Sequence, residues 1–367
     1  MSLTAGIVGL PNVGKSTLFN AITNSRVEAA NYPFATIEPN VGIVEVKDDR
    51  LINLANLFEP ERTIFTTFEF TDIAGLVKGA SAGEGLGNKF LANIRQVDAI
   101  CHVVRCFEDG DIQHVYNRID PIDDIEIINY ELIMADMNSC ENRISKVEKK
   151  ALQQKDKDSL FEYNILKRVH EGLSKSVLIR NMEFDDTEAE YLRGFEFLTA
   201  KPVIYIANIK EEEINDPDTN EHFVKLKEYA AKENSEVVPI SARIEEELSD
   251  LDKEEKAMFL EDLGIKKSGL DELILKAYKT LGLKTFFTVG KDECRGWTFK
   301  DGMKAPDCAG IIHTDFKRGF IKAEVYAYDD MMEYKSEVKL KEAGKIRQEG
   351  KEYIVKDGDV IFFKFNV

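Results

Sequence analysis

The chain has 367 residues, of which 43% are hydrophobic, and this is enough for more than one packed core. Its net charge of −18 excludes strong non-specific binding of nucleic acid, because an acidic surface repels phosphate; no DNA partner is expected. No stretch approaches the roughly 18 unbroken apolar residues of a membrane span, and no charged-then-apolar leader is present, so we expect no membrane partner and a cytoplasmic location. The five cysteines form no C-x-x-C pair and predict reduced thiols.

The first motif along the chain has the spacing of a phosphate-binding loop. The apolar run 5–8 is followed by Gly9-Leu-Pro-Asn-Val-Gly14-Lys15-Ser16 and then by the helix-like stretch 17–23. A strand, a glycine-rich turn and a helix start direct backbone N–H groups toward phosphate. Lys15 is predicted to reach the β- and γ-phosphates and Ser16 to bind Mg²⁺. The other nucleotide contacts expected from this segment are Asn12, Val13, Gly14 and Thr17.

Two further elements of a nucleotide switch follow at suitable distances. The strand-like run 65–71 leads into Asp72-Ile-Ala-Gly75, a D-x-x-G pattern. Asp72 is expected behind Mg²⁺, and the Gly75 amide is expected to meet the γ-phosphate. Between the phosphate loop and this pattern lies the polar loop 31–40, in which Thr36 is the candidate for a second hydroxyl ligand of Mg²⁺.

The residue that would activate water is not evident from the D-x-x-G pattern. Leu76 occupies the position of the water-orienting glutamine of Ras-like enzymes, and an apolar side chain cannot orient water. Of the two histidines that follow, His102 lies in the apolar run 99–104 and is predicted to be a packed strand residue. His114 lies in a polar, glycine-containing stretch and is the catalytic candidate, with an ordinary exposed loop histidine as the alternative.

The composition changes between residues 121 and 200. Apolar residues recur at helical spacing among many charges, which predicts a long helical hairpin. Its basic surface is either hydrated or in contact with nucleic acid, and consists of Lys146, Lys149, Lys150, Lys155 and Lys157.

Base recognition is expected after the apolar run 202–207, which is typical of a strand in a parallel sheet. There the chain reads Asn208-Ile209-Lys210-Glu211, where a GTPase carries N-K-x-D and the aspartate accepts two protons from guanine. The changes to Ile209 and Glu211 favour adenine, which Asn208 and backbone groups beside Ile209 can bind. A second strand-like run, 236–240, leads to Ser241 and Ala242, whose backbone is expected to complete the pocket. The alternative is that Glu211 accepts guanine despite its extra methylene.

The C-terminal part, from 283, has four strand-like runs, 285–289, 297–299, 322–327 and 360–365, around the helix-like run 306–312. Short strands around one helix predict a small β-grasp domain. Two groups of basic residues there are candidates for RNA contact or for plain hydration: Lys317, Arg318 and Lys322, and Lys339, Lys341, Lys345 and Arg347.

These motifs together resemble those of the YchF-type branch of Obg-related nucleotidases, the ribosome-binding ATPases. The match runs from the phosphate loop through 74–81 and 83–88, the N-x-x-E at Asn208 and Glu211, and the segment 357–363. The resemblance implies ATP rather than GTP, a coiled-coil insertion, a C-terminal TGS domain and contact with the ribosome through rRNA or a ribosomal protein. It also implies a mobile loop histidine, here His114. In related potassium-activated nucleotidases an asparagine at the place of Asn12 helps to hold K⁺.

The fold prediction is α/β: a doubly wound, mostly parallel P-loop sheet with an α-helical coiled-coil insertion and a C-terminal TGS-like β-grasp domain. The predicted parts are the nucleotidase domain in two pieces, 1–122 and 201–282, the helical hairpin 123–200, and the β-grasp domain 283–367. The predicted function is Mg²⁺-dependent hydrolysis of ATP to ADP and phosphate by a switch that binds the ribosome. Two alternatives remain: a GTPase of ribosome assembly, and a nucleotide-gated RNA or protein binding module whose hydrolysis is incidental.

Overall fold

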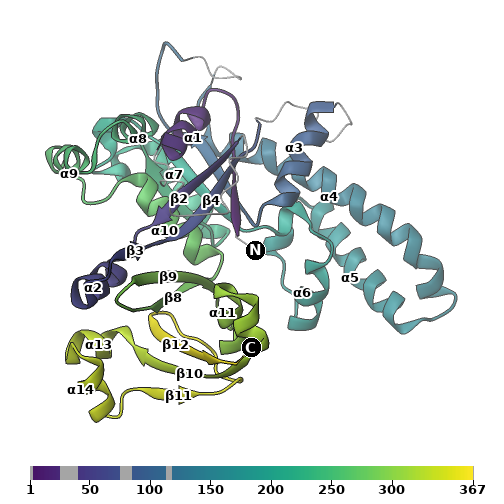
Figure 1. Ribbon diagram of the computed structural model, residues 1–367. Coiled ribbons are helices and arrows are strands. Elements are labelled where there is room, and N and C mark those ends of the chain that lie inside the picture. The colour runs from purple at the N-terminus through teal and green to yellow at the C-terminus, as the bar shows by residue number, and fades with distance from the viewer. Residues whose placement is uncertain (1–2, 25–39, 75–84, 113–117, 367) are drawn as a thin grey trace. The chain divides into compact units, whose positions relative to one another are not determined.

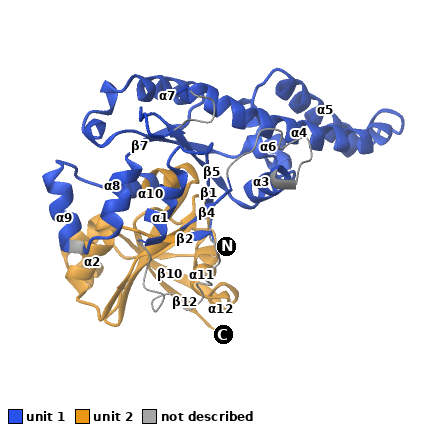
Figure 2. Ribbon diagram, turned by 90° about the horizontal axis from the view of Figure 1, so that it is seen from above, with its two compact units in different colours: residues 1–25, 38–42, 69–273 blue, residues 26–37, 43–68, 274–367 orange. Residues whose placement is uncertain are grey.

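The computed structural model describes residues 3–24, 40–74, 85–112 and 118–366 (Figure 1). The chain forms two compact units, coloured separately in Figure 2. Unit 1 comprises residues 1–25, 38–42 and 69–273, and unit 2 comprises residues 26–37, 43–68 and 274–367. Unit 2 thus groups 43–68 with the C-terminal segment, whereas the sequence division placed these residues in the first nucleotidase part. The division into four segments drawn from the sequence stays a prediction.

Unit 1 is organised around a six-stranded sheet. Its strands lie in the order β2 (Val41–Val46), β4 (Thr66–Asp72), β1 (Thr4–Val8), β5 (Ala99–Arg105), β6 (Val203–Asn208) and β7 (Glu236–Ile240), with residues 43–46 and 66–68 counted in unit 2. From β4 to β7 all neighbours pair in parallel. Strands β5 and β6 are buried at every residue, as expected for parallel strands covered on both faces. The predicted α/β, mostly parallel sheet is confirmed.

Helices surround this sheet and connect its strands. They include α1 (Lys15–Asn24), α3 (Gly85–Gln96), α7 (Glu221–Lys232), α8 (Ala242–Ser249), α9 (Lys253–Asp262) and α10 (Gly269–Thr280), whose last residues belong to unit 2. Helix α1 packs against α8, and α7 packs against β6 and β7. Short 3₁₀ turns occur at Ile179–Asn181, Leu198–Ala200, Glu211–Glu213 and Pro217–Thr219.

The predicted helical hairpin is confirmed. Helices α4 (Pro121–Leu152) and α5 (Lys157–Ser174) lie side by side, and α6 (Asp186–Arg193) follows (Figure 1). Helix α4 begins at Pro121, where a missing N–H costs nothing, and the Asp120 side chain accepts hydrogen bonds from the N–H groups of Ile122 and Asp123. Apolar residues such as Cys140, Leu166 and Val169 form its core. All five lysines of the basic surface are exposed.

Unit 2 contains a second six-stranded sheet. Its strands lie in the order β11 (Arg347–Glu349), β10 (Phe320–Ala327), β12 (Asp359–Phe365), β8 (Leu283–Thr288), β9 (Glu293–Lys300) and β3 (Arg62–Ile64). Helix α11 (Ala305–Ile312), followed by α12 (Thr314–Arg318), packs over an aromatic core that includes Phe286 and Phe363. A sheet packed on one helix agrees with the predicted C-terminal fold.

A second core in unit 2 was not predicted, because it uses residues from far upstream. Helix α2 (Asp49–Phe58) contributes Leu51 and Leu54 to a cluster with α13 (Tyr328–Tyr334) and α14 (Glu337–Glu342). Arg50 lies 2.8 Å from the Asp357 carboxylate, whose other oxygen accepts a hydrogen bond from the Thr285 N–H. Strand β3 pairs in parallel with β9. The segment 43–68 is therefore an integral part of this unit.

The five cysteines and His102 all lie in the interior of the protein. All five cysteines are buried and unpaired, as the odd count and spacing predicted. His102 is buried in β5, and burial lowers the pKa of its imidazole to about 3, which keeps it neutral and confirms a packing role. In the parts of the chain that the structure describes, no helix is long and apolar enough to cross a membrane.

A buried carboxyl group connects two segments at one end of unit 1. Glu245 in α8 is only 5% exposed, and its Oε1 accepts a hydrogen bond of 2.7 Å from the Gly269 N–H, where α10 begins. Burial raises the pKa of this carboxyl group from 4.5 to about 7, since the charged form is poorly solvated there. The folded state therefore holds a proton that the unfolded chain releases at lower pH.

We predict a pH-dependent contribution of Glu245 to stability. The contribution is present in full below pH 4.5 and is lost as the pH rises through about 7, with a total change of up to about 3 kcal/mol. Glu245→Gln keeps an acceptor for the Gly269 N–H but cannot ionise, so it should gain stability relative to the wild type between pH 5 and pH 8. Urea unfolding at several pH values measures this difference. The exposed neighbour variant Glu246→Gln is the control, and parallel curves for wild type and Glu245→Gln would contradict the prediction.

Candidate nucleotide site

The phosphate-loop motif adopts the predicted strand, loop and helix arrangement. Strand β1 ends at Val8, and α1 begins at Lys15, so that Lys15 and Ser16 lie in the first turn of the helix. The Lys15 ammonium group forms an ion pair with the carboxylate of Asp72 at the end of β4. The structure thus brings together two residues that the sequence separates by 57 positions. Their surroundings combine a cation, a carboxylate and the positive end of a helix, which suits a phosphate–metal complex.

The loop conformation requires glycine at two positions. Gly14 has a φ angle of +92°, and a Cβ atom there would lie 2.2 Å from the Nδ2 atom of Asn208. A Cβ atom at Gly9 would lie 2.8 Å from the carbonyl oxygen of Val103. Asn12 also has a positive φ angle, +65°, in a region that asparagine tolerates better than most residues. The glycines therefore allow the loop to pass close to β5 and to the end of β6.

Asn208, at the end of β6, bridges two loops. Its Nδ2 atom donates to the carbonyl oxygen of Val13 at 2.9 Å, and its Oδ1 atom accepts from the Ala242 N–H at 3.0 Å. The residue is only 6% exposed. Asn208 is predicted from the sequence to bind the base; in the structure its amide nitrogen and its amide oxygen each make a hydrogen bond to the protein, and the contact with the base stays a prediction. Its role in the fold is to hold the phosphate loop against the loop that starts α8.

A pocket of about 620 Å³ opens beside this bridge. This volume lies in the range typical of small-ligand sites. Of the residues selected from the sequence, those that line it are Asn12, Gly14, Thr17, Asn208, Ile209, Glu211, Ser241 and Ala242. Val13 is buried beneath the loop, and Lys15, Ser16 and Asp72 are not among the lining residues. Residues from three distant segments therefore form one concave surface.

The position that normally reads guanine is engaged in an ion pair. Glu211 accepts a contact of 3.0 Å from the Nε atom of Arg243, and Arg243 also lies 3.4 Å from Glu247. Ile209, in contrast, is 2% exposed, and its N–H donates to the Ile240 carbonyl oxygen at 2.9 Å. The Glu211 carboxylate is thus directed toward a cation of its own protein.

One wall of the pocket was missed by the sequence analysis. It is formed by residues that directly follow β5, namely Phe107, Glu108, Asp109 and Ile112. The available signal was their place after the carboxyl end of a fully buried strand, which is where ligands bind in open parallel sheets. The polar sequence there has no recognised nucleotide motif, so it indicated only a loop.

Three predicted site residues, Thr36, Gly75 and His114, lie outside the described residues. Among the residues that the structure does describe, no group of three or more His, Cys, Asp and Glu side chains is arranged to hold a metal ion. The donors expected for Mg²⁺ are of another kind, the hydroxyl of Ser16 and the carboxylate of Asp72. An oxygen-only set beside the end of a phosphate loop fits that ion.

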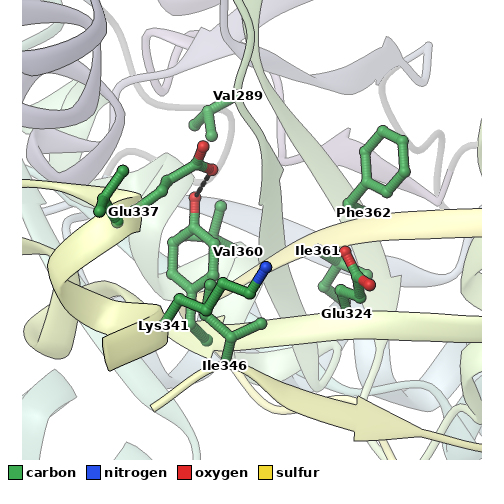
Figure 3. Close-up of a pocket in the computed structure, with 10 residues that line it drawn as sticks. Val289, Glu324, Glu337, Lys341, Ile346, Val360, Ile361 and Phe362 are labelled. Carbon is green, nitrogen blue, oxygen red and sulfur yellow. Dashed lines mark hydrogen bonds between the residues drawn. The ribbon is translucent and has the colours of Figure 1, made fainter. Parts of the chain in front are cut away.

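A second pocket, of about 430 Å³, lies within unit 2 (Figure 3). Its apolar walls include Val289, Ile346 and Phe362, and the Tyr326 hydroxyl group donates to Glu337 at 2.9 Å. None of the catalytic, nucleotide-binding or metal residues predicted from the sequence lines it. The pocket beside Asn208 is therefore the candidate functional site.

Comparisons with known proteins agree with this assignment. A family model described as a 50S ribosome-binding GTPase matches residues 4–150, and a model for a YchF-GTPase C-terminal region, described as a protein of unknown function, matches residues 283–366. The chain is 60% identical to the ribosome-binding ATPase YchF of Bacillus subtilis and 51% identical to that of Escherichia coli O157:H7, over the full length of both chains in each case.

The solved structure of the Schizosaccharomyces pombe YchF GTPase has a similar fold. It is 38% identical, with a TM-score of 0.90, and the alignment covers 99% of this chain and 98% of that chain. The resemblance drawn from the sequence motifs is therefore confirmed over the whole length. With its phosphate loop, its N-x-x-E base segment and its C-terminal sheet, the chain belongs to the YchF family.

Proposed function

We propose that this protein binds ATP in the pocket beside Asn208, hydrolyses it to ADP and phosphate with Mg²⁺, and binds the ribosome in a nucleotide-dependent way. The observation that carries the ATP assignment is the ion pair between Glu211 and Arg243 at the base end of the pocket. The names of the full-length bacterial relatives, which describe ribosome-binding ATPases, support both the nucleotide and the partner.

The preference for adenine follows from what the base would meet. Guanine presents two N–H donors on its N1 and N2 edge and needs an available carboxylate. Glu211 is already paired with Arg243, so binding guanine there would require that the pair be broken. Adenine instead presents the N6 amino donor and the N1 acceptor, which backbone carbonyl and N–H groups around Lys210 and Ser241 can satisfy. The buried Ile209 also lacks the lysine stem that packs over guanine in an N-K-x-D site.

The phosphate end has a cation and oxygen donors that suit a triphosphate with its metal ion. Lys15, now paired with Asp72, is placed to stabilise the β- and γ-phosphate oxygens through its ammonium group. Ser16 and Asp72 supply oxygen atoms for Mg²⁺, which when bound neutralises the charge of those phosphates. The roles of Thr36 on the metal, Gly75 at the γ-phosphate, His114 in activating water and Asn12 in holding K⁺ stay predictions from the sequence.

Ribosome binding requires local basic surfaces, because the chain as a whole is acidic and repels the phosphates of RNA. The exposed lysines of α4 and the α4–α5 connection, such as Lys149 and Lys155, form one such basic surface on the hairpin. A ribosomal partner also agrees with the cytoplasmic location expected from the sequence. We further propose that nucleotide state controls this contact. Leu76 follows D-x-x-G and cannot orient water, which favours slow turnover that depends on a partner. A slow enzyme of this kind suits a switch that reports its nucleotide state to the ribosome.

We predict that the wild type binds a non-hydrolysable ATP analogue at least tenfold more tightly than the GTP analogue, a difference of about 1.4 kcal/mol. Titration of nucleotide-free protein in Mg²⁺ and K⁺ measures both constants. Arg243→Ala should lower this ratio severalfold, because Glu211 becomes available to guanine, while Lys225→Ala, at an exposed cation of α7 that does not line the pocket, serves as the control. A wild-type preference for GTP would make the protein a GTPase instead. An unchanged ratio in Arg243→Ala would remove the ion pair from the explanation of selectivity.

We also predict that ribosome binding depends on the nucleotide. In co-sedimentation with purified ribosomes, the bound fraction of the wild type should differ between the ATP analogue and ADP. Lys15→Ala, which loses the ammonium group for the triphosphate, should give one bound fraction under both conditions. Equal binding of the wild type in both states would contradict the switch. Nucleotide-dependent binding with turnover that ribosomes do not change would favour a binding module with incidental hydrolysis.

A further inference from the structure

Arg105 is the last residue of β5 and one of the largest side chains that are fully buried in the molecule, with 1% exposure. A guanidinium group is normally left in water, because burial removes the solvation of its charge. In the β5–β6 pairing Arg105 lies opposite Asn208, so it stands next to the residue that bridges the phosphate loop and the α8 loop. A buried cation at this point requires an explanation.

Its hydrogen bonds are directed to one short loop. Nε donates to the carbonyl oxygen of Phe107 at 3.1 Å, Nη1 to that of Ile112 at 2.9 Å, and Nη2 to that of Asp109 at 3.2 Å. The guanidinium carbon also lies 4.4 Å from the centre of the Phe107 ring, a cation–π distance. All three nitrogen atoms of the group thus donate hydrogen bonds to residues that follow Arg105 by at most seven positions in the sequence.

The loop that Arg105 holds is the wall of the nucleotide pocket described above. The three residues whose carbonyl groups accept its hydrogen bonds also line the pocket: Phe107, Asp109 and Ile112. The start of this loop is also fixed from outside, since the Asn220 side chain donates to the Cys106 carbonyl oxygen at 2.8 Å. Residues 108–112 of the loop are exposed, and Gly110 adds backbone freedom there, so the hydrogen bonds of Arg105 fix the loop where burial does not.

We propose that Arg105 is a positioning residue of the nucleotide site, which folds residues 107–112 around its guanidinium group and so forms one wall of the pocket before the nucleotide arrives. This inference rests on the proposed function only in taking the pocket as the nucleotide site. A planar guanidinium group with several N–H donors in fixed directions is needed, because the three carbonyl oxygens surround it. A lysine ammonium group keeps the charge but cannot reach all three oxygens from one point.

The test compares Arg105→Lys and Arg105→Met with Arg118→Met, which removes an exposed arginine from the same β5–α4 connection. The dissociation constants for ATP and GTP analogues are measured for each protein, together with the melting temperature. The expected result is an increase of at least tenfold in the dissociation constant for both Arg105 variants, which stay folded at the assay temperature with a lowered melting temperature, and no change of either quantity for Arg118→Met. Wild-type affinity in a folded Arg105→Lys or Arg105→Met protein would overturn the proposal.

A second measurement uses the wild-type protein and therefore does not depend on whether the variants fold. With arginine labelled at ¹⁵Nε, the Arg105 signal should shift when the nucleotide saturates the pocket, while the Arg118 signal stays in place. An Arg105 signal that is unchanged at saturation would overturn the proposal. Because each variant is compared with the wild type for the same nucleotide, a wild type that prefers GTP would refute the ATP assignment but leave this test valid.

Discussion

The candidate site depends on the two hydrogen bonds made by the Asn208 side chain. The side-chain nitrogen donates to the Val13 carbonyl oxygen in the phosphate loop, and the side-chain oxygen accepts from the Ala242 N–H at the start of α8. Both bonds are buried, so losing either would leave a polar group without a partner, at a cost of about 1–3 kcal/mol. The same contact explains why residue 14 is glycine, since any Cβ atom there would collide with the Asn208 amide. The phosphate end and the base end of the pocket are therefore held as one structure.

Charged side chains form ion pairs at both the phosphate end and the base end of the site. At the phosphate end, Lys15 and Asp72 pair with each other. At the base end, Arg243 forms an ion pair with Glu211, which occupies the position that reads guanine in an N-K-x-D site. Between them, Arg105 fixes the wall that follows β5. Protein groups thus hold the two loop walls and the Glu211 carboxylate in place, which reduces the ordering cost of binding.

Much of this arrangement could be predicted from the sequence, where a local pattern has one physical meaning. The phosphate loop, the buried strands β5 and β6 and the long hairpin each follow from spacing and periodicity alone. The contribution of α2 to the unit 2 core could not be predicted, because the Arg50–Asp357 pair joins residues 307 positions apart. The hydrogen bonds of Asn208 to Val13 and Ala242 could not be predicted for the same reason. Sequence motifs predict which residues meet a ligand, but the contacts between distant loops appear only in the folded chain.

Asn208 holds the phosphate loop in place through its buried hydrogen bonds. The most direct measurement is competition binding of ATP and of inorganic tripolyphosphate, which has no base, to the wild type and to Asn208→Ala. We predict that both ligands lose affinity by a similar factor of at least ten, because the variant releases the phosphate loop. A loss confined to ATP, with tripolyphosphate binding unchanged, would contradict it and place Asn208 on the base.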